Sequence, residues 1–208
     1  MGTGKSTVAR MFKELGAVVL DADALAHRAM EPKRLAWRRI VQTFGEGILN
    51  DDQTIHRRRL ADLIFADAER RRTLERIIHP HVLREIKQAL HRLQRARRVP
   101  AVVLDVPLLI ESGAHQLADA LVVVTAPADV QRERLKTRHG WSDDDIAVRM
   151  EAQLELSAKV ALADYVVDNS DGVEATRTQV RSIWNRQVPA KRRVSKRSRA
   201  SRSRRGSK

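Results

Sequence analysis

The stretch Met1-Gly2-Thr3-Gly4-Lys5-Ser6-Thr7 decides the fold of this chain, because it carries the second half of a phosphate-binding loop. The complete pattern is G-x-x-x-x-G-K-[ST], and its first half has no counterpart ahead of Met1. Such a loop runs into a helix whose N-terminal N–H groups attract anions. We therefore predict that residues 2–7 hold the phosphates of a nucleotide. Lys5 would reach the β- and γ-phosphates, and the Ser6 hydroxyl would coordinate Mg²⁺.

The residues after the loop have the spacing of one helical face. Val8, Met11, Phe12 and Leu15 lie at i, i+3, i+4 and i+7, and Gly16 is a typical stop signal. The alternative is a glycine-rich terminus without function. We disfavour it because a strand with acidic residues follows at the expected distance.

That strand is the apolar run of residues 17–20, which leads to Asp21 and Asp23. It has the pattern of a buried parallel strand, and ligands of open α/β sheets bind where such strands end. Alternation along an extended chain would place both acids on one side, beside the phosphate loop. One would accept the proton of an acceptor hydroxyl, and the other would organise the metal-bound water. Either acid could instead cap the next helix.

Three more strands are predicted, at residues 102–105, 121–125 and 165–168, and helical patterns separate them. This alternation is typical of a doubly wound parallel α/β sheet. Asp105 ends a hydrophobic strand, as the acid of a Walker B motif does, and is predicted to hold Mg²⁺ through water. Pro107 and Leu108 follow it and would form an apolar wall against the substrate.

A helical insertion is predicted at residues 35–98, because about sixty residues separate the second strand from the third, more than one crossover needs. Asp67 would cap one of its helices. His79 would begin the last of them, with Pro80 in the first turn. His79 is either a substrate contact or a cap or packing residue.

A helical lid is predicted at residues 131–160, where two helices meet at Gly140. Ser142 would start the second helix, with three aspartates in its first turn. The lid carries Arg134, Arg138 and Arg149, and closing arginines stabilise the charge of a transferred phosphoryl group. The alternative is that these arginines form surface ion pairs with the aspartates.

Composition excludes several classes of protein. The chain has no cysteine, and therefore neither a disulfide framework nor a thiolate zinc site. Its apolar runs are too short to span a membrane, and no signal peptide is visible. We expect a soluble cytoplasmic enzyme that does not contact the membrane.

Much of the net charge of +14 comes from residues 189–208, which hold ten Lys or Arg and no acid. The preceding residues hold 30 basic and 26 acidic residues. The basic segment is too poor in apolar residues to fold, and we predict a disordered tail. It either binds nucleic acid or another acidic surface, or is a dispensable solvated extension, which we favour.

Six segments together resemble the dephospho-coenzyme A kinase family, a group of P-loop small-molecule kinases. The phosphate loop alone is shared with many ATPases, so the later segments carry most of the specificity. The resemblance covers residues 1–188 and rests on residues 2–7, 18–27, 44–49, 78–80, 104–113 and 164–170.

The resemblance implies ATP-dependent phosphorylation, with Mg²⁺, of the ribose 3′-hydroxyl of dephospho-coenzyme A, the last step of coenzyme A synthesis. By position, Asp23 resembles the general base, and Lys5 and Arg138 complete the catalytic set. Arg149 and Asn169 would contact ATP. Substrate binding would fall to Asp21, His79, Pro107 and Leu108.

The resemblance also implies a domain plan. A kinase core of residues 1–34, 99–130 and 161–188 would carry the insertion at 35–98 and the lid at 131–160. In this family a first strand lies centrally in the sheet and enters the phosphate loop. We expect that strand to be missing here, which would leave its two neighbours unpaired and weaken ATP binding.

Two other functions stay open at this point. The first is another P-loop kinase, acting on a nucleoside monophosphate or a sugar. The second is a nucleic-acid-binding protein that uses the basic tail.

Overall fold

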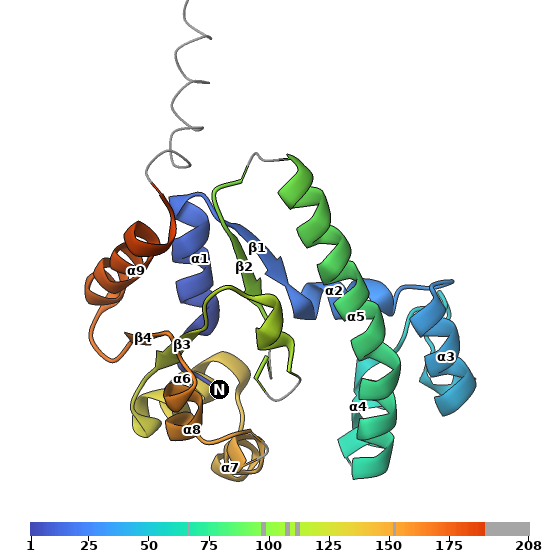
Figure 1. Ribbon diagram of the computed structural model, residues 1–208. Helices are drawn as coiled ribbons and strands as arrows, with labels where there is room; N and C mark the ends of the chain where they lie inside the picture. The colour runs from blue at the N-terminus through green and yellow to red at the C-terminus, as the bar shows by residue number, and fades with distance from the viewer. Residues whose placement is uncertain (66, 97–98, 107–108, 111–112, 152, 190–208) are drawn as a thin grey trace, which may run out of the picture. The chain divides into compact units, whose positions relative to one another are not determined.

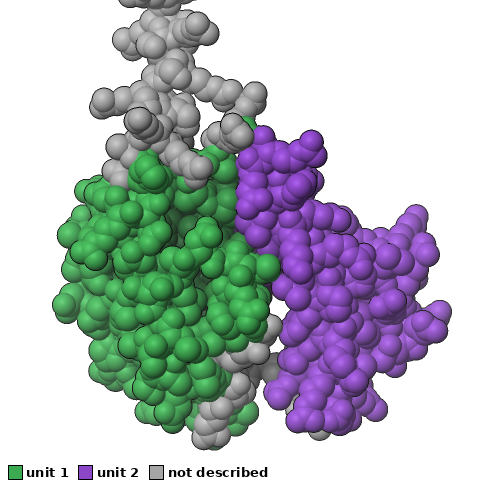
Figure 2. All heavy atoms as spheres, in the orientation of Figure 1, with its two compact units in different colours: residues 1–19, 96–208 green, residues 20–95 purple. Residues whose placement is uncertain are grey.

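The computed structural model describes residues 1–65, 67–96, 99–106, 109–110, 113–151 and 153–189. The predicted basic tail therefore lies outside the described residues, apart from Pro189. The chain divides into two compact units, which Figure 2 colours separately. Unit 1 comprises Met1–Val19 and Ala96–Lys208, and unit 2 comprises Leu20–Arg95.

The elements of unit 1 alternate between helices and short strands (Figure 1). They are α1 (Lys5–Leu15), β2 (Val102–Asp105), η2 (Ala114–Leu117), β3 (Val122–Thr125), α6 (Ala128–His139), α7 (Asp143–Glu151), α8 (Leu156–Ala161), β4 (Tyr165–Asp168) and α9 (Val173–Gln187). Strand β1 (Val18–Asp21) crosses the division between the units. The remaining elements are helical and belong to unit 2: α2 (Ala22–Ala29), α3 (Leu35–Phe44), η1 (Glu46–Ile48), α4 (Arg57–Phe65) and α5 (Ala68–Ala96).

The four predicted strands are all present, and they form two sheets of two strands each, β1–β2 and β3–β4. Strands β3 and β4 are parallel, in a register that runs from Val122 opposite Tyr165 to Thr125 opposite Asp168. Helix α1 contacts both β2 and β3, although these strands belong to different sheets. The predicted α/β class is confirmed, and within unit 1 helix α1 packs against one strand of each sheet.

The core of unit 1 is the apolar face that the sequence predicts for α1. Val8, Met11 and Phe12 are buried there. They pack against the buried face of α9, where the ring of Trp184 lies 6.5 Å from that of Phe12 between centroids. Gly16 ends α1 as predicted, with φ +116° and its N–H bonded to the helix. This packing fixes the helix whose N-terminus carries the phosphate loop.

Helix α5 corrects one prediction about unit 2. It is continuous from Ala68 to Ala96 and contains Pro80, so His79 lies within the helix and does not begin it. Proline removes its own N–H from the ladder and crowds the carbonyl four residues before it. The turns on both sides are nevertheless anchored by buried side chains, Leu74 before it and Val82 after it. The predicted cap at Asp67 is confirmed, since its carboxylate accepts hydrogen bonds from the N–H groups of residues 69 and 70.

None of the helices in the described part of the chain combines the length and the apolar character that a membrane crossing requires.

Candidate active site

The phosphate loop forms a turn that opens directly into α1. Gly2 and Gly4 have φ values of +71° and +91°, in the left-handed region that glycine adopts without strain. Gly4 is the N-cap of α1 and provides no side-chain cap, and the first turn holds no acid. The N-cap residue therefore offers the N–H groups at this end no side-chain acceptor, and together with the helix dipole they favour an anion.

Lys5 and Asp105 form an ion pair at the mouth of this turn. The Lys5 ammonium donates a hydrogen bond to the Asp105 carboxylate, which is buried at the end of β2. The two residues are separated by 100 positions in the sequence, and the structure brings them together. The cation of the loop and the acid of the Walker B-like strand thus belong to one site.

The loop also packs tightly against two other elements of unit 1. An ideal Cβ on Gly2 would lie 2.7 Å from the carbonyl oxygen of Gln131 in α6. An ideal Cβ on Gly4 would overlap the side-chain nitrogen of Asn169, which follows β4. Both glycines are therefore needed for space as well as for backbone conformation.

Asn169 connects the loop to the rest of the unit. Its side-chain amide donates to the carbonyl oxygen of Thr3 at 2.8 Å. Its Oδ1 accepts from the hydroxyl of Thr176 at 2.9 Å, and its backbone carbonyl accepts from Arg134 at 3.0 Å. The predicted contact of Asn169 with ATP stays a prediction; in this structure its amide holds the phosphate loop.

Helix α6 supplies two side chains behind the loop: Arg134, which the sequence assigned to the lid, and Gln131, which it did not assign to any site. Gln131 is buried and donates from Nε2 to the carbonyl of Ala126 at 2.7 Å. Arg134 leaves its buried Nη1 without a hydrogen-bond partner in the described residues. A single polar residue on an amphipathic helix carries no local signal of such a contact.

The structure describes most residues of the predicted lid. Ser142 caps α7 as expected, accepting from the N–H of Asp145, whose carboxylate accepts in return from the Ser142 hydroxyl. Asp143 pairs with Lys136 at 2.8 Å. Arg138 is exposed near the end of α6, close to the left-handed Gly140. Arg149 lies in α7, and its side chain falls outside the described residues.

The two acids after β1 differ from the sequence prediction. The strand ends at Asp21 and α2 begins at Ala22, so Asp23 lies in the first turn of a helix. The reason is local: the Asp21 carboxylate accepts from the N–H of Ala24 at 3.1 Å, and this N-cap starts a run of helix-forming residues. The alternation argument for Asp21 and Asp23 is therefore wrong, and the alternative that Asp21 caps a helix is confirmed.

Of the remaining predicted substrate contacts, the structure describes only His79. His79 is exposed in the middle of α5, within unit 2. Pro107 and Leu108 lie outside the described residues.

The described part of the chain offers Mg²⁺ a small set of oxygen donors at the phosphate loop. That part contains no group of three His, Asp or Glu side chains that could bind an ion. Mg²⁺ in kinase sites is bound through one or two protein oxygens together with phosphate oxygens and water. The Ser6 hydroxyl in the first turn of α1 and the Asp105 carboxylate beside Lys5 fit this donor set.

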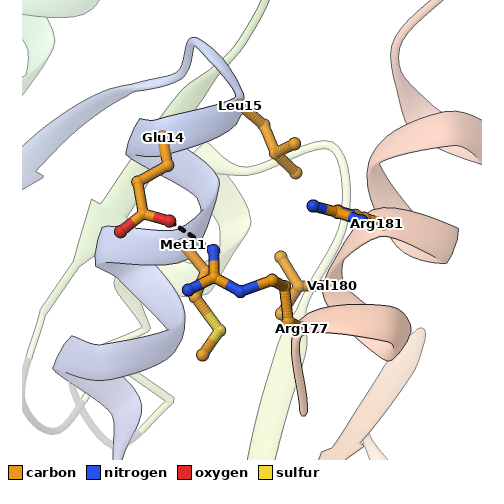
Figure 3. A pocket seen from close by; sticks show the side chains of 6 residues that line it. All are labelled: Met11, Glu14, Leu15, Arg177, Val180 and Arg181. Atoms are coloured by element: carbon orange, nitrogen blue, oxygen red, sulfur yellow. Dashed lines mark hydrogen bonds and ion pairs between the residues drawn. The ribbon is translucent and has the colours of Figure 1, made fainter. Parts of the chain in front are cut away.

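The opposite end of α1 carries a separate cavity of about 180 Å³ (Figure 3). It lies between α1 and α9, and the ion pair of Glu14 with Arg177 forms one wall. The lining residues from α1 lie in the last two turns of that helix, so the cavity is distinct from the phosphate site. The lining residues are Met11, Glu14, Leu15, Arg177, Val180 and Arg181.

Comparison with known proteins supports one family. The family model for dephospho-CoA kinase matches residues 1–175. The dephospho-CoA kinase of Symbiobacterium thermophilum is 42% identical over 184 residues, which cover 88% of this chain and 77% of the relative. That of Aquifex aeolicus is 41% identical, covering 88% of this chain and 92% of the relative.

Two solved structures have the same fold. The crystal structure of TT1252 from Thermus thermophilus matches with a TM-score of 0.76 and 32% identity, over 91% of this chain and 94% of that one. Dephospho-CoA kinase from Campylobacter jejuni matches with a TM-score of 0.65, over 88% of this chain and 90% of that one. At 24% identity, the second likeness supports the fold alone. From the family model and the relatives, this chain belongs to the dephospho-CoA kinase family, the ATP-dependent kinases of the last step of coenzyme A synthesis.

Proposed function

We propose that this chain transfers the γ-phosphoryl group of ATP to the ribose 3′-hydroxyl of dephospho-CoA, with the phosphate loop and the Lys5–Asp105 pair at the centre of the site. The observation that carries the proposal is that pair, set at the uncapped N-terminus of α1. An ammonium, a carboxylate and N–H groups without a side-chain cap meet there, and phosphoryl transfer requires this combination of charges.

The loop residues bind and orient ATP. The N–H groups of residues 2–7 cradle the phosphates, and Lys5 moves from Asp105 to the β- and γ-phosphate oxygens as the nucleotide binds. The Ser6 hydroxyl, and Asp105 through water, would hold Mg²⁺. The metal, when bound, supplies positive charge that offsets the charge of the transferred group.

Asp23 is the proposed general base. A ribose hydroxyl is a weak nucleophile, so the enzyme gains most by aligning it with the γ-phosphate and accepting its proton as the new bond forms. Asp21 supports this role by capping the helix that carries Asp23, which fixes the first turn of α2. Asp21 thus acts through the backbone, while its second carboxylate oxygen stays available for substrate.

The proposal also assigns a substrate-binding segment and a lid. Residues 35–98, with His79, form the part that binds the coenzyme A moiety, together with Pro107 and Leu108 from the core. Residues 131–160 act as a lid, in which Arg138 and Arg149 close over the phosphates and keep water away. The reaction consumes ATP, and we place it in the cytoplasm, where ATP is supplied.

The test is a comparison of acceptors. Purified protein is incubated with ATP and Mg²⁺ in the presence of dephospho-CoA or of each nucleoside monophosphate, and the products are identified by mass spectrometry and NMR. We expect a single new phosphate on the ribose 3′-oxygen of dephospho-CoA. Phosphorylation of the nucleoside monophosphates alone would contradict the proposal. The Lys5→Met variant, which keeps much of the side-chain length without the charge, should lose turnover under the same conditions.

A further inference from the structure

We infer that Thr176, a residue of α9, is a positioning residue that sets the conformation of the phosphate loop through Asn169. This inference deepens the function proposed above and rests on it. Thr176 is 0% exposed, and its hydroxyl donates to Oδ1 of Asn169 at 2.9 Å. The amide nitrogen of Asn169 in turn donates to the carbonyl oxygen of Thr3 at 2.8 Å. Two hydrogen bonds therefore link the buried face of α9 to the loop.

The Thr3 carbonyl, which can only accept, selects the orientation of the Asn169 amide, and the hydroxyl of Thr176 holds the amide in it. An asparagine amide has an acceptor on one side and donors on the other. If the amide were rotated by half a turn, its oxygen would face the carbonyl oxygen of Thr3, and neither could donate. The Thr176 hydroxyl would then accept from the amide nitrogen and donate to the carbonyl of Gly172, at 3.4 Å, while the carbonyl of Thr3 would lose its donor. The orientation that satisfies Thr3 is the one in which Thr176 donates to Oδ1.

The backbone of Asn169 is already fixed from two sides. Its N–H donates to the carbonyl of Thr125 in β3 at 2.9 Å. Its carbonyl accepts from Arg134 of α6 at 3.0 Å. Rotation of the side-chain amide is the freedom that remains, and Thr176 restricts it.

The geometry of the peptide bond carries this restraint to the phosphate site. The carbonyl of Thr3 and the N–H of Gly4 belong to one planar trans peptide, so they point in opposite directions. Holding the carbonyl against Asn169 turns the Gly4 N–H to the other side of the loop. Gly4 keeps the left-handed conformation that this arrangement needs, with φ +91°. Thr176 thereby orients a donor of the loop without touching the nucleotide.

The experiment compares variants of α9 that differ in one hydroxyl. Thr176→Val removes the donor and keeps the shape, and Thr176→Ser restores the donor. Thr178→Val is the matched control, because the Thr178 hydroxyl bonds to the carbonyl of Glu174 in its own helix, at 3.0 Å. Each variant is assayed for ATP binding by calorimetry, for KM of both substrates, for kcat and for melting temperature.

We expect Thr176→Val to weaken ATP binding and to raise KM for ATP by about five- to tenfold, as the loss of one buried hydrogen bond predicts. KM for dephospho-CoA should stay within about twofold, because Thr176 is linked to the phosphate loop through Asn169 and is none of the predicted contacts of dephospho-CoA. Thr176→Ser and Thr178→Val should bind ATP like the unmodified protein.

The inference is overturned if Thr176→Val and Thr178→Val bind ATP equally well, or if the two KM values of Thr176→Val rise together. Should Thr176→Val fold poorly, Asn169→Asp tests the same link. A carboxylate cannot donate to the Thr3 carbonyl, so ATP binding should fall at least as far. Calorimetry reads ATP binding without turnover, so a failure of the acceptor assignment is seen separately from a failure of this inference.

Discussion

Replacing Gly4 by alanine tests how the phosphate loop is built. Gly4 has φ +91°, and an alanine Cβ there would overlap the side-chain nitrogen of Asn169. A residue with a side chain is strained by about 1–2 kcal/mol in the left-handed region. The Asn169 amide must also move, and the loss of its hydrogen bond to Thr3 costs about 1 kcal/mol more. We expect a total loss of about 2–3 kcal/mol in the free energy of unfolding.

Gly113→Ala separates the two contributions. Gly113 has φ +70°, and an alanine Cβ there meets nothing within 4 Å. This variant therefore shares the backbone strain of Gly4→Ala and lacks the collision. It should lose about 1–2 kcal/mol of stability and bind ATP normally.

The assay is urea denaturation of both variants, with ATP binding measured by calorimetry. Gly4→Ala should be the less stable of the two and should bind ATP at least about tenfold more weakly than the unmodified protein, because the Thr3–Gly4 peptide loses its orientation. Equal stability of the two variants, combined with normal ATP binding by Gly4→Ala, would refute the role of Asn169 in holding the loop.

Three further predictions concern other parts of the chain. Asp23→Asn should lower kcat by about 10²–10⁴-fold and leave ATP affinity unchanged, as loss of a general base does; near-normal turnover removes Asp23 from the mechanism. Deletion of residues 189–208 should leave turnover and melting temperature unchanged, because we assign the tail no part in the core; loss of turnover in a folded protein contradicts this. The hydrogen bond from Arg177 lowers the pKa of Glu14 from its ordinary value, so the stabilisation that this pair contributes is present at neutral pH and is lost as the pH falls through the lowered pKa. Glu14→Gln should flatten the acid limb of stability against pH, and an unchanged acid limb disproves the assignment.

Local signals predicted much of this fold. The phosphate loop, the apolar face of α1 and the four strands each have a clear pattern within a few residues. The helix caps at Asp67 and Ser142 are predictable for the same reason. The pairing of Lys5 with Asp105 follows from the fold, since both residues lie where ligands of such sheets bind.

The errors arise where one local signal opposes another. Pro80 indicates a helix start, yet α5 runs through it, because buried residues on both sides hold the flanking turns. The apolar run before Asp21 indicates a strand that continues to Asp23, but the Asp21 side chain caps α2 and ends the strand. The outcome depends in each case on contacts that the periodicity does not encode.

The contacts of Thr176 and Gln131 could not be predicted from the sequence, for a different reason. Each is one buried polar residue in a helix, and its partner lies elsewhere in the fold. Asn169 and Thr3, which Thr176 joins, are 166 positions apart. The spacing and composition of the sequence give no indication of a contact between residues so far apart in the chain.

The same long-range contacts explain how so short a loop can keep a defined shape. Two of its first four residues are glycines, which lose more conformational entropy than any other residue when they are fixed. Without support, such a loop would adopt many conformations, and ATP binding would have to select one of them. Gln131 limits the space at Gly2, and Asn169 holds the Thr3 carbonyl, so part of that ordering is complete before the nucleotide arrives. Side chains that never touch ATP can therefore contribute to its affinity, and Thr176 is the one whose removal isolates this contribution.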